Sequence, residues 1–509
     1  MDSESGNEYD VIVVGGGNAA LCAAISAAEQ GGRVLLLERS PESERGGNST
    51  YTDGKFRAVY DAADVRALVP DLTEDEVAAS DFGAYTEGDF FDDMGRITQY
   101  RTDPDLCEIL VRNSREILYW LKGNGVRFMP NYGRQAYRVD GRFKFWGGTT
   151  LVVAAGGPGL VDALYRAAEA RGVEVRYEAW VKDLIHHEGV GVSGVHVRVD
   201  GQMRSIRAGA VVLACGSFEA NAEWRAKYLG PGWDLAKVRG SKYNTGDGLA
   251  MALKIGAQPY GHWSGCHATA WERYASDFGD MAITPQYQRH SYTFGIVVNA
   301  RGDRFIDEGA DFRNYTYAKY GSEVLNQPGQ VAWQIYDGKV LHLLTDEYRT
   351  RHVTKLRADT LEGLIAQLDE VDGERLGKTI NQFNAAVRQD VPFDPNTKDG
   401  RDAPGLSVPR SNWANTIDTA PFEAYAVTCG ITFTFGGIRI TTEGQVVDTD
   451  HRPIPGLFAA GEMVGGLFYF NYPGASGLTS GSVFGRLAGA SAAQAAIAMR
   501  EEPLVKVAG

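Results

Sequence analysis

The hydrophobic pattern is clearest near the N-terminus, where the apolar residues 11–14 are followed by Gly15 and Gly17. An apolar run without polar alternation predicts a strand buried on both faces, as in a parallel sheet. The alanine-rich residues 19–30 predict a helix, and the apolar residues 34–37 predict a second buried strand. Strand, turn, helix and strand in this order predict a βαβ unit of an α/β protein.

This unit has the features of a dinucleotide-binding site. Gly15 and Gly17 have no Cβ, so the backbone can approach a pyrophosphate. The helix that begins at Asn18 and Ala19 presents free amides and its positive dipole end to that anion. Glu38, about 20 residues further on, stands where a carboxylate binds ribose hydroxyls. A glycine turn in an unrelated α/β protein is the alternative, but the complete pattern in register favours the dinucleotide.

Other segments predict further elements. Residues 105–122 and 160–170 have helical periodicity, and residues 173–177 and 210–216 predict strands. Residues 180–207 alternate around glycine turns, which predicts a β-meander. Residues 61–100 are acidic and irregular. We interpret them as a solvated surface excursion, because their acids lack the compact spacing of a metal site.

The pattern changes between residues 257 and 422, where aromatic, arginine and histidine residues become dense. The strand–glycine–helix order returns at residues 456–462 and in the apolar segment 474–498. We therefore predict a discontinuous, Rossmann-like FAD-binding domain, residues 1–256 and 425–509, with an inserted α+β substrate-capping domain, residues 257–424. FAD is favoured over NAD, because the long flavin half needs cover from a second chain segment.

Length and composition agree with this α/β interpretation. A chain of 509 residues exceeds one ordinary core, so two domains are expected. The net charge of −14 argues against a nucleic-acid partner, because no basic stripe can displace phosphate counterions. The polar residues 1–8 and the lack of 18 consecutive apolar residues predict a cytoplasmic protein without membrane insertion.

The five cysteines are scattered and form no C-x-x-C pair. We therefore expect neither an iron–sulfur cluster nor a structural metal site, and interpret the cysteines as small hydrophobes in a reducing compartment. Without further redox centres, the chain has to pass electrons to a separate electron-transfer partner, to a quinone through that partner, or to oxygen.

Three further turns contribute candidate FAD contacts beside Glu38 and Arg39. Residues 45–50 combine glycines with hydroxyls and can wrap the middle of a long cofactor, whereas residues 245–248 place an acid where it can also cap a helix. The two C-terminal turns complete the predicted site. The candidates from these turns are Gly46, Gly47, Asn48, Ser49, Asp247, Gly461, Glu462, Ser476, Gly477 and Leu478.

These motifs resemble the fumarate reductase/succinate dehydrogenase flavoprotein superfamily. The matching pieces are residues 15–20, Glu38, and residues 46–49, 245–248 and 459–462, which together span nearly the whole chain. Within that superfamily the sequence resembles FAD-dependent tricarballylate dehydrogenases, on residues 307–317, 429–437 and 465–474. The resemblance implies a FAD domain interrupted by a substrate-clamping domain, with the reaction at their junction beside flavin N5.

The resemblance also implies roles for individual residues. It matches His267 to a substrate-binding histidine of the fumarate reductases and Arg313 to their proton-transfer arginine, although the spacing is not identical. Phe433 stands where those enzymes have a second substrate histidine, and Ser476 where they have a carboxylate-clamping arginine. These departures disfavour fumarate or succinate as substrate. Tyr472 instead resembles a tyrosine of the 3-ketosteroid dehydrogenases, where a tyrosine and a backbone amide polarise the substrate carbonyl.

Each of these candidates has a simpler interpretation. Arg313 is a proton-transfer residue, a carboxylate clamp, or an ion-pair partner of Glu308 or Asp311, since a free arginine is essentially always protonated. His267 has a usable pKa and two ring nitrogens, but many buried histidines are structural. Tyr472 can also be a core residue.

Four further residues are candidates for substrate binding. Thr432 and Thr434 alternate with apolar residues, which is also the pattern of an ordinary strand. Arg289, followed by a histidine, is a possible anion anchor. Ser476 belongs to this set as well as to the cofactor set.

Three functions remain open. The first is a FAD-dependent dehydrogenase that oxidises a polycarboxylate such as tricarballylate to an unsaturated acid such as cis-aconitate. The second is an enoate (fumarate-type) reductase or a 3-ketosteroid-type dehydrogenase, and the third is a non-catalytic flavin-binding protein. Covalent superfamily members attach FAD through a histidine near the position of Asn48. No histidine precedes His186, so we predict noncovalent FAD.

Overall fold

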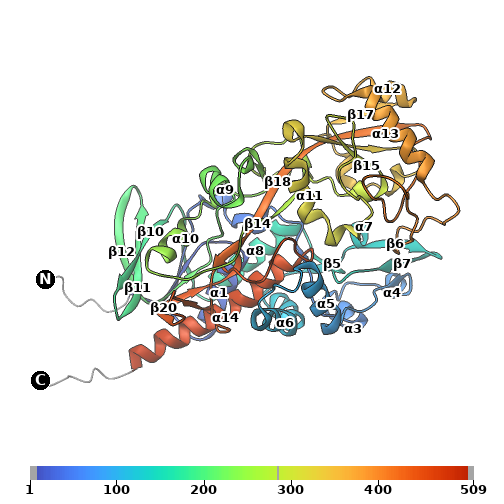
Figure 1. Ribbon diagram of the computed structural model, residues 1–509. Coiled ribbons are helices and arrows are strands. Elements are labelled where there is room, and N and C mark those ends of the chain that lie inside the picture. The colour runs from blue at the N-terminus through green and yellow to red at the C-terminus, as the bar shows by residue number, and fades with distance from the viewer. Residues whose placement is uncertain (1–7, 284–285, 502–509) are drawn as a thin grey trace, which may run out of the picture.

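A computed structural model describes residues 8–283 and 286–501. An eight-stranded sheet contains the N-terminal βαβ unit, in which β1 pairs in parallel with β2 and β12 (Figure 1). The order β10-β11-β12-β1-β2-β9 is extended from β12 by β20 and β19. The predicted strand, helix and strand are confirmed as β1 (Tyr9–Val14), α1 (Asn18–Glu29) and β2 (Val34–Leu37). The polar segment 1–7 lies outside the described residues.

The strand β12 joins two parts of this sheet. Together β10 (Trp180–His187), β11 (Gly191–Val199) and β12 (Gln202–Leu213) form the antiparallel meander that the sequence predicts. The last part of β12 then pairs in parallel with β1 and with β20 (Pro453–Ala459). The sheet is completed by β9 (Glu174–Arg176) and β19 (Gln445–Val447).

A second, six-stranded sheet is built around the long strand β18 (Phe422–Ile438). In Figure 1 the strand β18 runs diagonally from the main body toward α12 (Leu361–Ile365) and α13 (Gly373–Ala386). The predicted domain division at residue 424 falls inside β18. The other strands are β13 (Lys237–Val238), β14 (Pro259–Glu272), β15 (Ile296–Asn299), β16 (Ala332–Tyr336) and β17 (Lys355–Ala358).

The inserted region has a hydrophobic cluster of its own. Leu376, Ile380 and Phe383 of α13 are buried with Ile296 and Ile335 of the second sheet. Their spacing of three and four residues places the three side chains on one helix face. This cluster packs α13 against the outer part of the second sheet.

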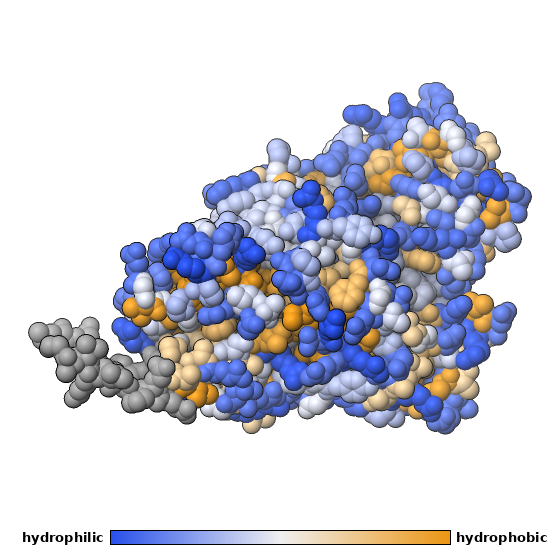
Figure 2. Space-filling view, turned by 60° about the horizontal axis from the view of Figure 1, so that its bottom comes forward, coloured by the Kyte–Doolittle hydropathy of each residue, from blue (hydrophilic) through white to orange (hydrophobic). Residues whose placement is uncertain are grey.

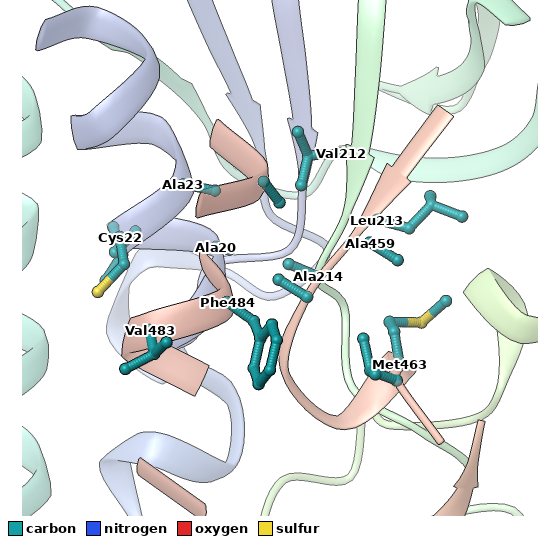
Figure 3. Close-up of a cluster of buried hydrophobic side chains, with 14 of the residues drawn as sticks. Ala20, Cys22, Ala23, Val212, Leu213, Ala214, Ala459, Met463, Val483 and Phe484 are labelled. Carbon is teal, nitrogen blue, oxygen red and sulfur yellow. The ribbon is translucent and has the colours of Figure 1, made fainter. Parts of the chain in front are cut away.

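The C-terminal helix α14 (Ser476–Glu501) packs against α1 with almost no space between the backbones. A Cβ at Gly485 would lie 2.4 Å from the carbonyl oxygen of Ala19, and one at Gly489 would lie 2.1 Å from that of Ala23. Figure 3 shows Ala20, Cys22 and Ala23 of α1 in one buried cluster with Val483 and Phe484 of α14. Small residues in this helix pair therefore bring both helix N-termini to one place.

Residues 61–100 differ from the irregular excursion that we expected. They form α3 (Ala62–Leu68), α4 (Glu74–Ala78) and α5 (Glu87–Ile97), each opened by a capping box. In α4, for example, Thr73 and Glu76 satisfy one another's backbone amides. Four acids of this segment, Asp61, Asp64, Glu76 and Asp89, thus belong to helix caps, where a carboxylate is favourable near the positive end of the helix dipole.

The remaining elements cover the two main sheets. The predicted helices 105–122 and 160–170 are confirmed as α6 (Pro104–Gly123) and α8 (Gly156–Glu169), which begins four residues early. Within the described residues, no helix is both long and apolar enough to cross a bilayer. One face of the molecule is mainly hydrophilic, with hydrophobic side chains gathered toward its middle (Figure 2).

Two small sheets complete the list of strands. One contains β3 (Lys55–Phe56), β5 (Phe128–Pro130) and β8 (Leu151–Val153). The other contains β4 (Ser80–Asp81), β6 (Ala136–Val139) and β7 (Arg142–Phe145). The other helices that bear on the site are α2 (Gly47–Thr50), α10 (Asp247–Lys254) and α11 (Tyr317–Leu325).

Candidate active site

One continuous cavity is lined by the βαβ turn of the first sheet and by β14 and β18 of the second. Most of the predicted cofactor residues line it: Gly15, Gly17, Asn18, Ala19, Glu38, Arg39, Gly47, Asn48, Ser49, Asp247, Gly461, Glu462, Gly477 and Leu478. Gly46 does not line the cavity. It has a φ of 100° before α2, so its role is the turn itself.

The glycine turn fits a bound dinucleotide. Gly15 has a φ of 112°, and a Cβ there would lie 2.4 Å from the carbonyl oxygen of Ala214, so only glycine is accommodated. Gly17 caps α1 without a side-chain hydrogen bond, which leaves first-turn amides for a ligand. Burial raises the pKa of Glu38, whose Oε1 accepts a hydrogen bond from the amide of Ser40. Its position at the end of β2 suits a ribose contact.

Asp247 lines the cavity, where it was predicted to reach the cofactor. It does not cap α10, because Gly246 occupies the N-cap position and no side chain caps the helix. Its Oδ2 lies 2.9 Å from Nη1 of Arg39 and accepts a hydrogen bond from the Trp180 indole at 3.0 Å. The Arg39 guanidinium also stacks 4.0 Å from the Trp180 ring. This cluster forms a polar wall at the end of the cavity near Glu38.

Asn18 joins the two ends of the cofactor site. Its Nδ2 donates to the carbonyl oxygen of Leu478 at 2.9 Å and to Oγ of Ser482 at 3.0 Å, both in α14. Its own amide donates to Oγ of Ser49 at 2.9 Å. Through its side chain and its backbone amide, one residue thus fixes α1, the 45–50 loop and α14 relative to one another.

Asn48 connects the same loop to the second sheet. Its Nδ2 donates to Oε1 of Glu219 at 2.6 Å and to the carbonyl oxygen of Thr432 at 2.9 Å. Its Oδ1 accepts a hydrogen bond from the amide of Ser241 at 2.9 Å. Where covalent relatives of the superfamily have a histidine, this chain has a side chain that is fully engaged with protein groups.

A pair of carboxyl groups lies beside this contact. Glu462 donates a hydrogen bond to Glu219, and burial together with the Glu219 charge raises the pKa of Glu462 well above its usual range. Oε1 of Glu462 also accepts a hydrogen bond from the amide of Thr434 at 2.9 Å. The pair therefore holds one proton between two buried carboxylates, as expected when like charges share a site.

His267 lies in an aromatic cage on β14. Its ring stacks on Phe433 at 5.3 Å and meets the edges of Tyr317 and Tyr472 at 5.0 and 4.9 Å. Neither ring nitrogen has a hydrogen-bond partner on another residue in the described ranges. Burial, with a smaller effect of the Arg239 charge, lowers the pKa of His267 well below 6.5. The imidazole is therefore neutral and available to a ligand in the cavity.

Tyr472 is held as a pair with Tyr317. The two hydroxyl oxygens are 2.9 Å apart, and the Tyr472 oxygen accepts a hydrogen bond from the Ala475 amide at 3.0 Å. Burial raises the pKa of Tyr472, so it is a neutral hydrogen-bonding group. The sequence did not single out Tyr317, because its partner lies 155 residues away.

Arg313 opens a short 3₁₀ turn before α11 and lines the same cavity as His267 and Tyr472. Of the two acids considered as its partners, Glu308 pairs with Arg304 and Arg410, which are both buried. The other, Asp311, pairs with Arg96 at 2.6 Å. Both carboxylates are therefore engaged by other cations.

Two of the predicted substrate-binding residues, Arg289 and Ser476, do not line the cavity. Arg289 is fully buried and pairs with Glu272 at 2.8 Å, whereas the next residue, His290, lines the cavity. The Arg289 guanidinium is held by Glu272 and by the carbonyl oxygens of Gln286 and Gln288, so the histidine and not the arginine reaches the site. Ser476 donates to the carbonyl oxygen of Pro473 at 2.7 Å and does not line the cavity either.

Both threonine candidates on β18 line the cavity. The hydroxyl oxygens of Thr434 and Ser217 are 2.5 Å apart, so the Thr434 side chain is already hydrogen-bonded within the protein. The Thr432 hydroxyl is buried and has no hydrogen-bond partner in the described part of the chain. Sequence reasoning also missed Arg239, which lines the cavity directly after β13.

Comparisons with known proteins agree with this geometry. A family model described as "FAD binding domain" matches residues 10–478. "Probable fumarate reductase Ifc3" from Shewanella frigidimarina is 30% identical over 96% of this chain and 75% of its own length. "3-oxosteroid 1-dehydrogenase" from Mycolicibacterium smegmatis is 26% identical over 98% of this chain and 99% of its length.

A solved structure has the same fold. The open conformation of a flavocytochrome c3 fumarate reductase superposes with a TM-score of 0.71 at 27% identity, covering 97% of this chain and 80% of that one. The predicted FAD cofactor and the α/β FAD-binding fold are thereby confirmed.

Proposed function

Because the chain belongs to the FAD-binding family of fumarate reductase-like flavoprotein oxidoreductases, we propose that it dehydrogenates a carbon–carbon bond next to a carboxylate. It is an FAD-dependent enzyme that acts on CH–CH bonds. The observation that carries the proposal is the meeting of His267, Arg313 and Tyr472 on the cavity that the glycine turn also lines.

The reaction needs three contributions. Bound FAD supplies the group that takes up or returns a hydride. The protein has to hold the α-proton and to stabilise the enolate-like charge that develops beside the carboxylate. We assign the transfer of the α-proton to Arg313. The neutral His267 orients the substrate through a ring nitrogen. The Tyr472 hydroxyl, held by the Ala475 amide, donates a hydrogen bond to a substrate oxygen.

The substrate class that we favour is a polycarboxylate similar to tricarballylate, oxidised to an unsaturated acid such as cis-aconitate. Support comes from two arginines, Arg239 and Arg313, on the cavity wall. Phe433 makes one side of the site apolar and stacks on His267, so a small dicarboxylate would lack the second histidine contact.

Two further candidates belong to the same reaction type. Enoate reduction is the reverse reaction, and the relatives include a probable fumarate reductase. A 3-ketosteroid-type dehydrogenation is supported by the Tyr472 hydroxyl beside a backbone amide.

Anaerobic half-reactions separate these functions. Oxidised holoenzyme is mixed with tricarballylate, succinate or a 3-ketosteroid, and photoreduced holoenzyme with cis-aconitate or fumarate. We expect tricarballylate to bleach the oxidised flavin band and cis-aconitate to restore it. Bleaching by the steroid alone would replace the proposed substrate class, and a flavin that responds to none of these compounds would contradict it.

We also propose that FAD is bound noncovalently. The support is that Asn48 occupies the loop position where the superfamily's covalent members carry a histidine. Its amide is hydrogen-bonded to Glu219, Thr432 and Ser241. Acid precipitation should release all flavin into the supernatant, whereas yellow colour that stays with the washed protein would refute this.

A further inference from the structure

Arg239 is an arginine of the cavity wall whose position is set by the fold. It follows β13 directly, and its amide donates to the carbonyl oxygen of Ile431 in β18 at 2.7 Å. Two residues later the amide of Ser241 donates to Oδ1 of Asn48 at 2.9 Å. A Cβ at Gly240 would lie 2.1 Å from that same oxygen, so the backbone next to Arg239 is pressed against the cofactor loop. The side chain is 8% exposed.

The Arg239 guanidinium has no anionic partner within residues 8–283 and 286–501. It makes no ion pair there, and its Nε is buried without a hydrogen bond. Its only described contact is the ring of Trp271, 5.6 Å from Cζ. Other buried guanidiniums are satisfied by the protein: Arg57 pairs with Asp93 and Arg289 with Glu272. Arg225, which has no acidic partner in the described residues, donates to four backbone carbonyl oxygens instead. A buried cation without a counter-charge is strongly unfavourable, so a cation on a cavity wall indicates an anionic ligand.

The charge lies among the candidate reaction residues. Burial is the main cause of the lowered pKa of His267 and of the raised pKa values of Tyr317 and Tyr472, and the Arg239 charge acts on all three in the lowering direction, so the guanidinium is within electrostatic reach of them. The polar cluster of Arg39 and Asp247 marks the other end of the cavity and is already neutral as a pair. Arg239 therefore serves the reacting end of the site.

We propose that Arg239 binds a carboxylate of the substrate, an organic di- or tricarboxylate, through its guanidinium. This inference rests on the proposed function and deepens it. A guanidinium matches a carboxylate with two parallel N–H···O bonds, which gives orientation as well as affinity. Ser476, which stands where related enzymes have an arginine, does not reach the cavity, and Arg239 supplies the missing cation from another strand.

The test measures binding apart from chemistry. Titration calorimetry is done on photoreduced holoenzyme, which cannot oxidise a saturated acid, with tricarballylate and with its uncharged trimethyl ester. In Arg239→Gln we expect the Kd for tricarballylate to rise at least about 30-fold, as for a lost charge-assisted pair. Arg239→Lys keeps the charge without the fork and should give an intermediate Kd. Ester binding should be unchanged.

A matched control is Arg66→Gln, which removes an exposed arginine paired with Glu74 at 2.8 Å, far from the cavity lining. It should leave tricarballylate binding as in the natural protein. A Kd for Arg239→Gln within threefold of the natural value would overturn the inference. So would loss of FAD with unchanged tricarballylate affinity, because Arg239 would then serve the cofactor.

Failure of the anchor and failure of the proposed function give different results. If tricarballylate binds through Arg239 but no acid changes the flavin spectrum in the half-reactions, the proposed function is wrong and the anchor stands. If tricarballylate reduces the flavin of Arg239→Gln with an unchanged KM, the anchor is wrong and the function stands. Natural holoenzyme that binds neither tricarballylate nor cis-aconitate overturns the anchor.

Discussion

The contact between α1 and α14 allows a sharp test of how the cofactor site is held together. In Gly489→Ala the new Cβ would start 2.1 Å from the carbonyl oxygen of Ala23, about 1.3 Å short of ordinary contact. The nearest atoms, the carbonyl oxygen, carbonyl carbon and Cα of Ala23, all belong to the backbone, so the helices have to separate. Overpacking costs up to about 3 kcal/mol, and the better helix propensity of alanine returns about 1 kcal/mol. We expect a net loss of about 2 kcal/mol.

The same substitution in another helix gives the control. Gly377 lies inside α13, where a Cβ would meet nothing within 4 Å. Gly377→Ala should therefore raise the free energy of unfolding by about 0.5 to 1 kcal/mol. Both variants are unfolded in urea with saturating FAD, and FAD affinity is measured by reconstitution of apoprotein.

FAD affinity should fall only in Gly489→Ala, because separating the helices moves Asn18 away from Leu478 and Ser482. A loss of about 1.4 kcal/mol in binding corresponds to a tenfold rise in Kd. A Gly489→Ala protein as stable as the natural chain, with unchanged FAD affinity, would refute this account of the helix contact.

Three further variants test the reaction site and its titrating groups. Arg313→Ala should abolish flavin reduction by tricarballylate and keep FAD bound, and reduction at the natural rate would remove Arg313 from the mechanism. His267 stays neutral in the folded state, whereas in the unfolded chain it takes up a proton below pH 6.5. The free energy of unfolding therefore decreases as the pH drops below that value. Urea unfolding of His267→Asn should lose this part of the acid-side slope, and an identical slope would contradict a neutral His267. Glu462 keeps its proton when folded but loses it when unfolded above pH 4.5, so its contribution lowers stability as pH rises above that value. Glu462→Gln should flatten this decline, and a steeper decline would place the shared proton elsewhere.

The parts of the fold that the sequence predicts well are local ones. The strands and helix of the first βαβ unit follow from hydrophobic runs and from glycine placement, and the meander follows from alternation around turns. The helices α3 to α5 were missed although their capping boxes are visible in sequence, as in Thr73 with Glu76 and Thr86 with Asp89. Short helices bury too few residues to show periodicity, so the caps were the usable signal.

The site is less predictable, because it depends on which side of an element faces the cavity. Arg289 and His290 are adjacent in sequence, but only the histidine faces the cavity, and the choice is made by strand pairing and by Glu272. Arg239 is distinguished by a buried Nε without a hydrogen-bond partner in the described residues, and that property exists only in the folded chain. Tyr317 likewise gains its role from a hydroxyl 155 residues away.

The hydrogen bond from Asn18 to Ser482 also has a consequence for the order of events during synthesis. The two residues are 464 positions apart, so at about 5 to 20 residues per second they are made roughly 25 to 90 s apart. Throughout that interval the apolar face of α1 lacks the helix that covers it. FAD binding through both helices therefore has to wait until α14 has emerged from the ribosome, which makes it a late step relative to the folding of the first βαβ unit.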